Sequence, residues 1–159
     1  MALGKEVTPE SSLGTVAHIF IAADRGAPMR SVRSAFATPG AGLGGDRYAE
    51  RRHRKGQDRD ITLIEMENIL AFREATGLEL EPDGPRRNVV TIGVRLNDLC
   101  GLQFRIGHVI VEALELCEPC KLFQKRTHPQ ALSFFAGRGG LRGRVLEAGQ
   151  IQVGDALRR

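Results

Sequence analysis

Short apolar runs, separated by glycine, proline and polar residues, recur along most of the chain. The first run is β-branched and apolar, and the run at 108–116 alternates apolar with polar side chains, as a half-buried strand does. This pattern predicts strands at residues 14–23, 31–37, 60–64, 88–94, 108–116, 141–148 and 150–157. A tight turn at Ala148 and Gly149 is predicted to join the last two strands into a hairpin.

The helical signals are fewer. Residues 65–76 carry apolar side chains at helical spacing, and Gly77 follows as a natural C-terminal cap. Two further short helices are predicted at residues 119–125 and 129–136. The glycine-rich stretch 38–48 is predicted to exclude regular structure.

Together these elements predict a mainly β domain with a few short helices, an α+β protein with a barrel-like sheet. Strands do not alternate regularly with helices, so a doubly wound parallel sheet is not expected. The 159 residues suffice for one domain with a buried core. We expect a loose N-terminal tail at residues 1–13 and a single domain over residues 14–159.

The net charge of +4 favours anionic partners only mildly. The distribution is more informative, because basic residues gather in a predicted surface loop at 49–59 and around a glycine-rich stretch at 138–144. The chain has one Tyr, no Trp and no nucleic-acid-binding motif, so nucleic acid is not expected as a partner. A small phosphorylated ligand fits the charge pattern.

The lack of long apolar segments indicates where the protein is located, and that location bears on whether its cysteines form disulfides. No apolar run approaches the roughly 18 residues of a membrane helix, and the first residues lack a signal-peptide core. We therefore expect a cytoplasmic protein without a membrane partner. Three cysteines, Cys100, Cys117 and Cys120, are then expected to be free thiols, because an odd number without a secretion signal argues against a disulfide framework.

Cys117 and Cys120 form a Cys-Glu-Pro-Cys pair at the end of a predicted strand. A thioredoxin-type pair needs a βαβ setting that is missing, and a zinc site needs a second regular pair, so no zinc is expected. One functional thiolate beside a bystander is the third interpretation. Cys120 starts a predicted helix and precedes Lys121, and both features favour a thiolate. Cys117 continues the strand and is interpreted as a core residue; by spacing alone, a buried apolar role for Cys120 stays open as well.

Three further motifs carry candidate binding residues. Residues 86–88 (Arg-Arg-Asn) lie before a strand, where guanidiniums and an amide suit a phosphate or a heteroaromatic edge. Residues 44–47 (Gly-Gly-Asp-Arg) let the backbone approach a ligand closely. Residues 137–140 (Gly-Arg-Gly-Gly), together with Arg142, form a candidate anion-binding loop with Arg138 as its binding residue. A solvated strand end or a structural turn explains each motif at least as well.

In order, these motifs resemble a stand-alone domain of the MOSC family, the molybdenum cofactor sulfurase C-terminal type. The matching series is Gly-Gly-Asp-Arg (44–47), Arg-Arg-Asn (86–88), Leu-Asn (96–97), Phe-Arg-Ile-Gly (104–107), Cys-Glu-Pro-Cys (117–120), Gly-Arg-Gly-Gly (137–140) and Gly-Gln-Ile-Gln-Val-Gly-Asp (149–155). It covers residues 14–157, nearly the whole chain. The resemblance implies a β-barrel related to the pyruvate kinase β-barrel domain.

The resemblance also implies a cofactor and the residues that hold it. The family's signature cysteine corresponds to Cys120, which would be the catalytic thiol and the ligand of molybdenum in the molybdenum–pterin cofactor. Its Arg-x-Asn stretch corresponds to Arg86 and Asn88, and its Gly-Asp-Arg turn to Asp46 and Arg47, as cofactor-binding residues. At the level of the family alone, an association with pyridoxal phosphate is implied as well.

Two functions follow from the resemblance. In the first, a molybdenum centre on Cys120 reduces N-hydroxylated small molecules, with electrons from a separate reductase because the chain carries no flavin or nicotinamide motif. In the second, Cys120 accepts persulfide sulfur from a cysteine desulfurase and passes it to metal–sulfur centres. A barrel that binds an anionic ligand without catalysis is the third interpretation.

Overall fold

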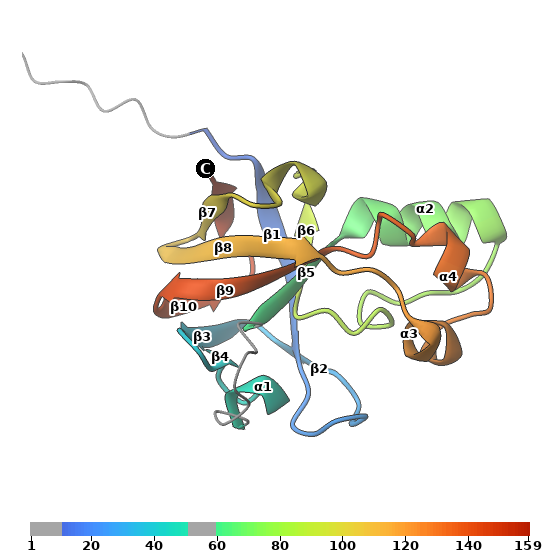
Figure 1. Ribbon diagram of the computed structural model, residues 1–159, viewed down its shortest axis with the longest axis horizontal. Helices are drawn as coiled ribbons and strands as arrows, with labels where there is room; N and C mark the ends of the chain where they lie inside the picture. The colour runs from blue at the N-terminus through green and yellow to red at the C-terminus, as the bar shows by residue number, and fades with distance from the viewer. Residues whose placement is uncertain (1–10, 51–59) are drawn as a thin grey trace, which may run out of the picture.

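The computed structural model describes residues 11–50 and 60–159, and its centre is a closed β-barrel (Figure 1). In chain order the strands are β1 (Gly14–Ile21), β2 (Arg30–Val32), β3 (Ser34–Thr38), β4 (Gly42–Leu43), β5 (Ile61–Glu65), β6 (Val89–Ile92), β7 (Gln103–Ile106), β8 (Val109–Leu116), β9 (Leu141–Glu147), β10 (Gly149–Gln152) and β11 (Ala156–Arg158). The main sheet has the order β11-β7-β8-β9-β5-β6-β1-β2, and β11 also pairs with β1. This pairing closes seven of the described strands into a ring and leaves β2 outside it. A smaller sheet has the order β10-β3-β4.

The helices are α1 (Arg47–Glu50), α2 (Met66–Thr76), the 3-10 helix η1 (Leu96–Leu99), α3 (Lys121–Arg126) and α4 (Ala131–Phe134). Helices α2, α3 and α4 lie together at one side of the barrel (Figure 1). Aromatic packing joins them: Phe72 lies 5.4 Å from Phe135, and Phe123 lies 5.3 Å from Phe135, between ring centroids. Because Phe123 belongs to α3, this packing fixes the helix that starts after Cys120. None of the described helices has the length and apolar character to cross a membrane.

The predicted fold class, mainly β with a few short helices and a barrel-like sheet, is confirmed. Alternation on β8 buries Val109, Val111 and Ala113 in the barrel interior, each at most 1% exposed. Helix α2 ends as predicted, because Gly77 adopts a φ of 69° and donates its N–H to the Arg73 carbonyl at 2.9 Å. A strand or helix lies within every segment that the apolar pattern marked.

The predicted hairpin at the C-terminus is wrong. Strand β10 follows the turn after β9 but pairs with β3, where Gly149 lies opposite Ala37 and Gln152 opposite Ser34. The chain turns again at Gly154, which has a φ of 94°, before β11 joins the barrel. Alternating side chains show that a strand covers a core, but they do not identify the strand beside it.

Residues 38–48 also depart from the prediction of no regular structure. Strand β4 returns onto β3, with Ala37 opposite Leu43, and α1 begins at Arg47. Glycine lowers strand propensity but allows this tight return, since Gly40 has a φ of 74°. Strand β7 was not predicted because turn signals surround it, although Phe104 is buried as expected. Of the predicted loop at 49–59, residues 49 and 50 belong to α1, and the rest lies outside the described residues, as does most of the predicted tail.

Candidate functional site

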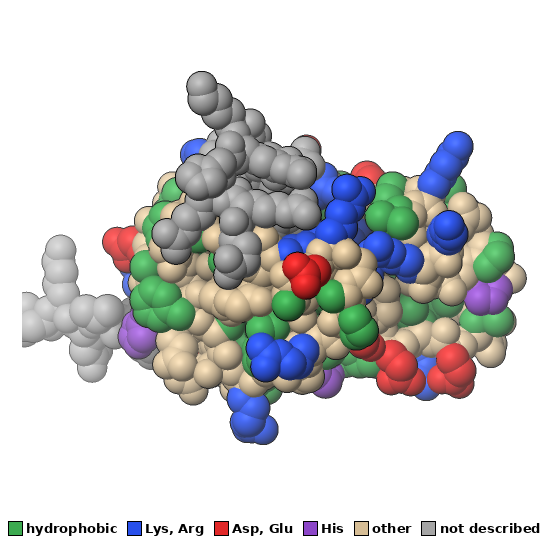
Figure 2. Space-filling model, turned by 90° about the horizontal axis from the view of Figure 1, so that it is seen from below, with side chains coloured by type: hydrophobic (Ala, Val, Ile, Leu, Met, Phe, Trp, Pro, Cys, Tyr) green, Lys and Arg blue, Asp and Glu red, His purple; other side chains and the backbone are tan. Residues whose placement is uncertain are grey.

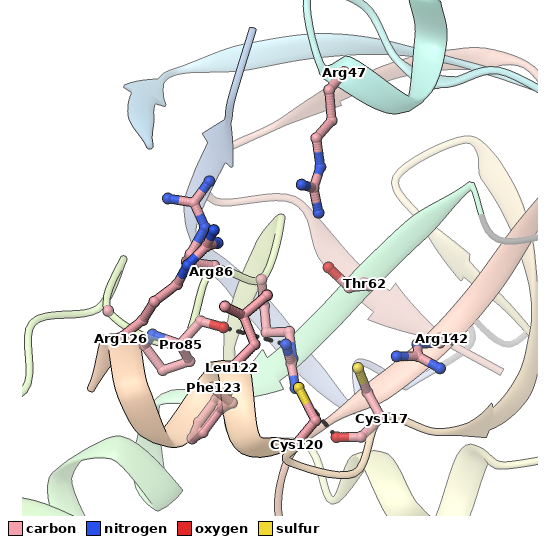
Figure 3. A pocket seen from close by; sticks show the side chains of 12 residues that line it. Arg47, Thr62, Pro85, Arg86, Cys117, Cys120, Leu122, Phe123, Arg126 and Arg142 are labelled. Atoms are coloured by element: carbon pink, nitrogen blue, oxygen red, sulfur yellow. Dashed lines mark hydrogen bonds between the residues drawn. The ribbon is translucent and has the colours of Figure 1, made fainter. Parts of the chain in front are cut away.

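A pocket of about 190 Å³ lies at the end of the barrel where β8 ends and β6 and β9 begin. Figure 3 shows its walls, which come from segments far apart in the sequence. Two thiols, Cys117 and Cys120, form one wall with Phe123 and Leu122 of α3. The other walls are rich in guanidinium groups. The pocket therefore combines sulfur, an apolar surface and positive charge in one place.

Cys120 lies at the N-terminal boundary of α3, and its side chain is exposed. Its backbone carbonyl accepts the N–H of Gln124 at 3.0 Å, as the first residue of a helix does. The buried Phe123 ring, one turn later, fixes the helix on the barrel. The sequence placed Cys120 at the start of a short helix, and the structure puts that helix start on the pocket wall.

Arg87 holds the thiol-bearing loop in place. Its Nη2 donates to the Cys117 carbonyl at 3.2 Å and its Nε donates to the Gly139 carbonyl at 2.9 Å. The guanidinium also lies over the Phe123 ring, 5.2 Å from the centroid. One side chain thus ties the segment before β6, the Cys-Glu-Pro-Cys loop and the Gly-Arg-Gly-Gly loop together.

The glycines of the Gly-Arg-Gly-Gly motif serve close packing around this loop. A Cβ on Gly139 would overlap the Cys117 carbonyl oxygen, and one on Gly140 would overlap the Leu63 carbonyl oxygen. Gly140 also accepts the Cys117 N–H at 2.7 Å. The motif therefore acts as a backbone-packing element beneath the thiols.

Three guanidinium groups share the far side of the pocket: Arg47 from α1, Arg86 before β6, and Arg126 at the end of α3. Figure 3 shows Arg86 beside Arg126, with Arg47 pointing into the pocket from across it. Burial, followed by the like charges of Arg126 and Arg47, lowers the pKa of Arg86. The positive charges of the three guanidinium groups repel one another, and an anion bound between them would relieve that repulsion.

Arg86 also has an unusual backbone. Its φ is 59°, and it is the one residue other than glycine with a positive φ among residues 11–50 and 60–159. A side chain in this region costs about 1–2 kcal/mol relative to glycine. Strain of this kind persists where the surrounding structure imposes it and is frequent at binding sites. The turn places the Arg86 guanidinium on the pocket wall.

Asn88, a predicted cofactor-binding residue, does not line the pocket. It is 2% exposed and accepts hydrogen bonds from the Thr62 N–H and hydroxyl, both at 3.1 Å. Its Nδ2 donates to the Phe20 carbonyl at 3.1 Å. Asn88 joins β1, β5 and β6, and contributes to the pocket by holding Thr62, which does line it.

The other predicted site residues also divide into those that line the pocket and those that do not. Arg47 and Arg86 lie in the pocket with Cys120, whereas Asp46 is buried beneath it and accepts the Ala22 N–H at 2.8 Å. Arg138 lies outside the pocket, exposed over the Phe134 ring at 4.5 Å from its centroid. Within the described residues, no group of three or more His, Cys, Asp or Glu side chains is arranged to hold a metal ion.

The sequence indicated no site role for Arg126, included Arg87 and Arg142 only as members of candidate anion-binding motifs, and indicated a core position for Cys117. Cys117 is indeed buried, at 1% exposed, yet it lines the pocket, where Arg142 lies beside it (Figure 3). Strand alternation put Arg142 on β9, but only the pairing of β9 with β8 brings it near the thiols. Arg126 carries no motif, since its place depends on how α3 packs.

Positive charge extends beyond the pocket. Lys and Arg side chains gather near the middle of the face seen from below in Figure 1, with few acidic groups between them (Figure 2). The neighbouring hollow, of about 320 Å³, shares Gly84, Arg86 and Arg126 with the pocket. The Arg86–Arg126 pair therefore faces two adjacent hollows.

The protein is thus a closed β-barrel with a thiol in an arginine-lined pocket at one end. A family model of the MOSC domain matches residues 50–158, more than half of the chain. The protein belongs to the MOSC domain family.

Solved structures show the same fold. YuaD from Bacillus subtilis superposes with a TM-score of 0.75 at 16% identity, covering 91% of this chain and 93% of YuaD. YiiM from Geobacillus stearothermophilus has a TM-score of 0.66 at 18% identity, over 94% of this chain and 74% of YiiM. YiiM from Escherichia coli has the same TM-score and identity, over 91% and 68%. A search of curated proteins finds no match.

Proposed function

We propose that this protein binds a molybdenum–pterin cofactor, with Cys120 as the thiolate ligand of the metal. The observation that carries the proposal is one pocket with an exposed thiol on one wall and converging guanidiniums on the opposite side. A ligand suited to both walls carries a thiophilic centre and an anionic group. The molybdenum–pterin cofactor, with a metal at one end and a phosphate at the other, has both.

The pocket residues fit such a group chemically. A thiolate is a soft donor that gives charge to a high-valent metal, and Cys120 supplies it. Arg86 and Arg126, with Arg47 opposite, would hold the phosphate, because guanidiniums bind its oxygens in pairs. Phe123 offers an apolar surface beside the thiols for a heteroaromatic ring.

We propose reduction of N-hydroxylated small molecules as the activity. When bound, the cofactor supplies oxygen-atom acceptance and two-electron chemistry. The chain's own part is to fix the cofactor and to bind substrate in the remaining open side of the pocket, where the arginines favour a neutral or anionic molecule. The electrons would come from a separate reductase.

The cofactor content of the purified protein tests this proposal. The protein is produced in a host that makes molybdenum cofactor, and bound metal and oxidised pterin are measured together. We expect about one molybdenum and one pterin per chain, the stoichiometry of a single metal ligand in a single pocket. Wild-type protein without either would overturn the proposal.

A second function, sulfur carriage, is favoured by the presence of two thiols in one pocket. Here Cys120 would hold a persulfide whose charge the guanidiniums stabilise. Mass spectrometry after incubation with a cysteine desulfurase and cysteine decides it, since the added sulfur must lie on Cys120. If neither cofactor nor persulfide is found, a non-catalytic anion-binding barrel is the remaining function.

Replacing Arg86 by glycine should separate stability from ligand binding. We expect the free energy of unfolding to rise by about 1 kcal/mol, because glycine relieves the positive φ. We also expect affinity for inorganic phosphate to fall about tenfold or more, the effect of one lost charge-assisted hydrogen bond. Denaturant unfolding and calorimetric titration measure the two quantities.

Arg126→Gln is the matched comparison for Arg86→Gly. It removes the neighbouring guanidinium without changing the backbone, so phosphate affinity should fall by a similar factor with no gain from relieved backbone strain. Arg138→Gln, outside the pocket, should leave the affinity unchanged. Equal phosphate affinity in all three variants would show that the arginine cluster does not bind the anion.

A further inference from the structure

Cys117 and Cys120 line the same pocket but differ in accessibility. Cys120 is exposed, whereas Cys117 is 1% exposed. Figure 3 shows the two side chains on neighbouring parts of the pocket wall. A reagent from solution therefore meets Cys120 first.

Both backbone polar groups of Cys117 are hydrogen-bonded, and a guanidinium lies beside its side chain. Its N–H donates to the Gly140 carbonyl at 2.7 Å, and its carbonyl accepts from Arg87 Nη2 at 3.2 Å. The Arg142 guanidinium lies beside its thiol in the pocket (Figure 3) and is itself paired with Glu115 at 3.3 Å. Cys117 belongs to neither of the two apolar clusters of the core. Its place on the pocket wall beside a guanidinium distinguishes Cys117 from a cysteine that only fills space in the core.

The charges around Arg142 agree with its position beside Cys117. Burial lowers the pKa of Arg142, but the Cys117 sulfur and the Glu115 carboxylate raise it by more, so the net shift is upward. Arg142 therefore stays a cation beside the sulfur.

We propose that Cys117 is the resolving thiol of Cys120: it attacks the Cys120 sulfur whenever that sulfur carries a leaving group, and closes a Cys117–Cys120 disulfide. Two residues between the cysteines is the spacing of dithiol pairs that exchange reversibly. The proposal rests on Cys120 being the reactive thiol of the proposed function, and it adds a regulation of that site.

The exchange balances with a small organic disulfide as oxidant. The Cys120 thiolate attacks one sulfur of the reagent, forms a mixed disulfide and expels one reagent thiolate. The Cys117 thiolate then attacks the Cys120 sulfur, the mixed disulfide breaks, and a second reagent thiolate leaves. The protein is oxidised by two electrons and the reagent is reduced by two. A persulfide on Cys120 reacts in the same way and expels hydrosulfide.

Closing the disulfide removes the Cys120 thiolate from the pocket. Neither a metal nor a sulfur atom can then be held there until a reducing thiol reopens the pair. The pocket is thereby switched off under oxidising conditions.

The test uses an aromatic disulfide whose thiolate is coloured, in equimolar amount, on a Cys100→Ser background that removes the other exposed thiol. We expect two coloured thiolates per reagent molecule and a Cys117–Cys120 disulfide in the peptide map. Adding Cys117→Ser should halve the release and leave the reagent bound to Cys120. A stable mixed disulfide on Cys120 with Cys117 present would overturn the proposal. Cys117→Ala gives the same comparison without a buried hydroxyl.

Arg142→Gln tests the contribution of the guanidinium. It should slow the second release about tenfold or more while leaving the first unchanged, the effect of losing one charge-assisted contact. Arg144→Gln is the matched control, since Arg144 lies on the same strand and pairs with Glu112 at 3.0 Å but does not line the pocket. Equal slowing of both releases in both variants would contradict the assignment to Arg142. The thiol–disulfide exchange needs no cofactor. Its outcome is therefore independent of the molybdenum content that tests the proposed function.

Discussion

Cys120→Ser should purify with almost no molybdenum. Loss of a residue that merely orients a ligand already lowers metal affinity roughly 10- to 100-fold, so loss of the ligand itself should cost at least about 100-fold. Serine keeps the size of the side chain, but its hydroxyl is a poor donor to a thiophilic metal. Metal and pterin content beside wild type, both purified from the same host, measure the effect.

The fold should be unaffected by this substitution. Cys120 is exposed, and its side chain makes no hydrogen bond that caps α3. We expect a change in unfolding free energy within about 0.5 kcal/mol, as for other surface substitutions. Cys100→Ser, exposed and outside the pocket, is the control and should keep full metal content. Wild-type metal content in Cys120→Ser would remove Cys120 from the proposed ligand set.

Asn88→Ala should destabilise the protein by about 3 kcal/mol, the cost of leaving buried polar groups without partners. The substitution strands the Thr62 N–H and the Phe20 carbonyl, which Asn88 joins across three strands. Urea unfolding followed by circular dichroism measures the loss.

Asn97→Ala is the matched control for Asn88. Asn97 is exposed and makes one side-chain hydrogen bond, to the Gly137 carbonyl at 2.8 Å, so its loss should cost less than about 1 kcal/mol. At a temperature where Asn88→Ala is folded, phosphate affinity should fall less than in Arg126→Gln. A stable Asn88→Ala protein with lost phosphate binding would instead make Asn88 a ligand-binding residue.

The glycine-rich motif at 137–140 shows what a local sequence pattern can and cannot predict. Residues 137–140 were expected to hold an anion through Arg138, because glycines and a cation together suit one. The structure uses Gly139 and Gly140 for close approach to the Cys117 and Leu63 carbonyls. Glycine marks a backbone that needs room, but whether a ligand or another strand takes that room depends on what lies opposite.

The sequence by itself determined most of the strands, though not β4 or β7, the end of α2 at Gly77, and the choice of Cys120 and Arg86 as candidate site residues. These depend on side-chain period, on a left-handed cap and on motif order, all of which are local. Tertiary structure alone decided that β10 pairs with β3, that Asn88 is internal, and that Arg126, Arg142 and Cys117 join the pocket. Those outcomes depend on which distant segments meet when the barrel closes. The alternation of apolar and polar side chains shows which face of a strand is buried, but it does not identify the neighbouring strand.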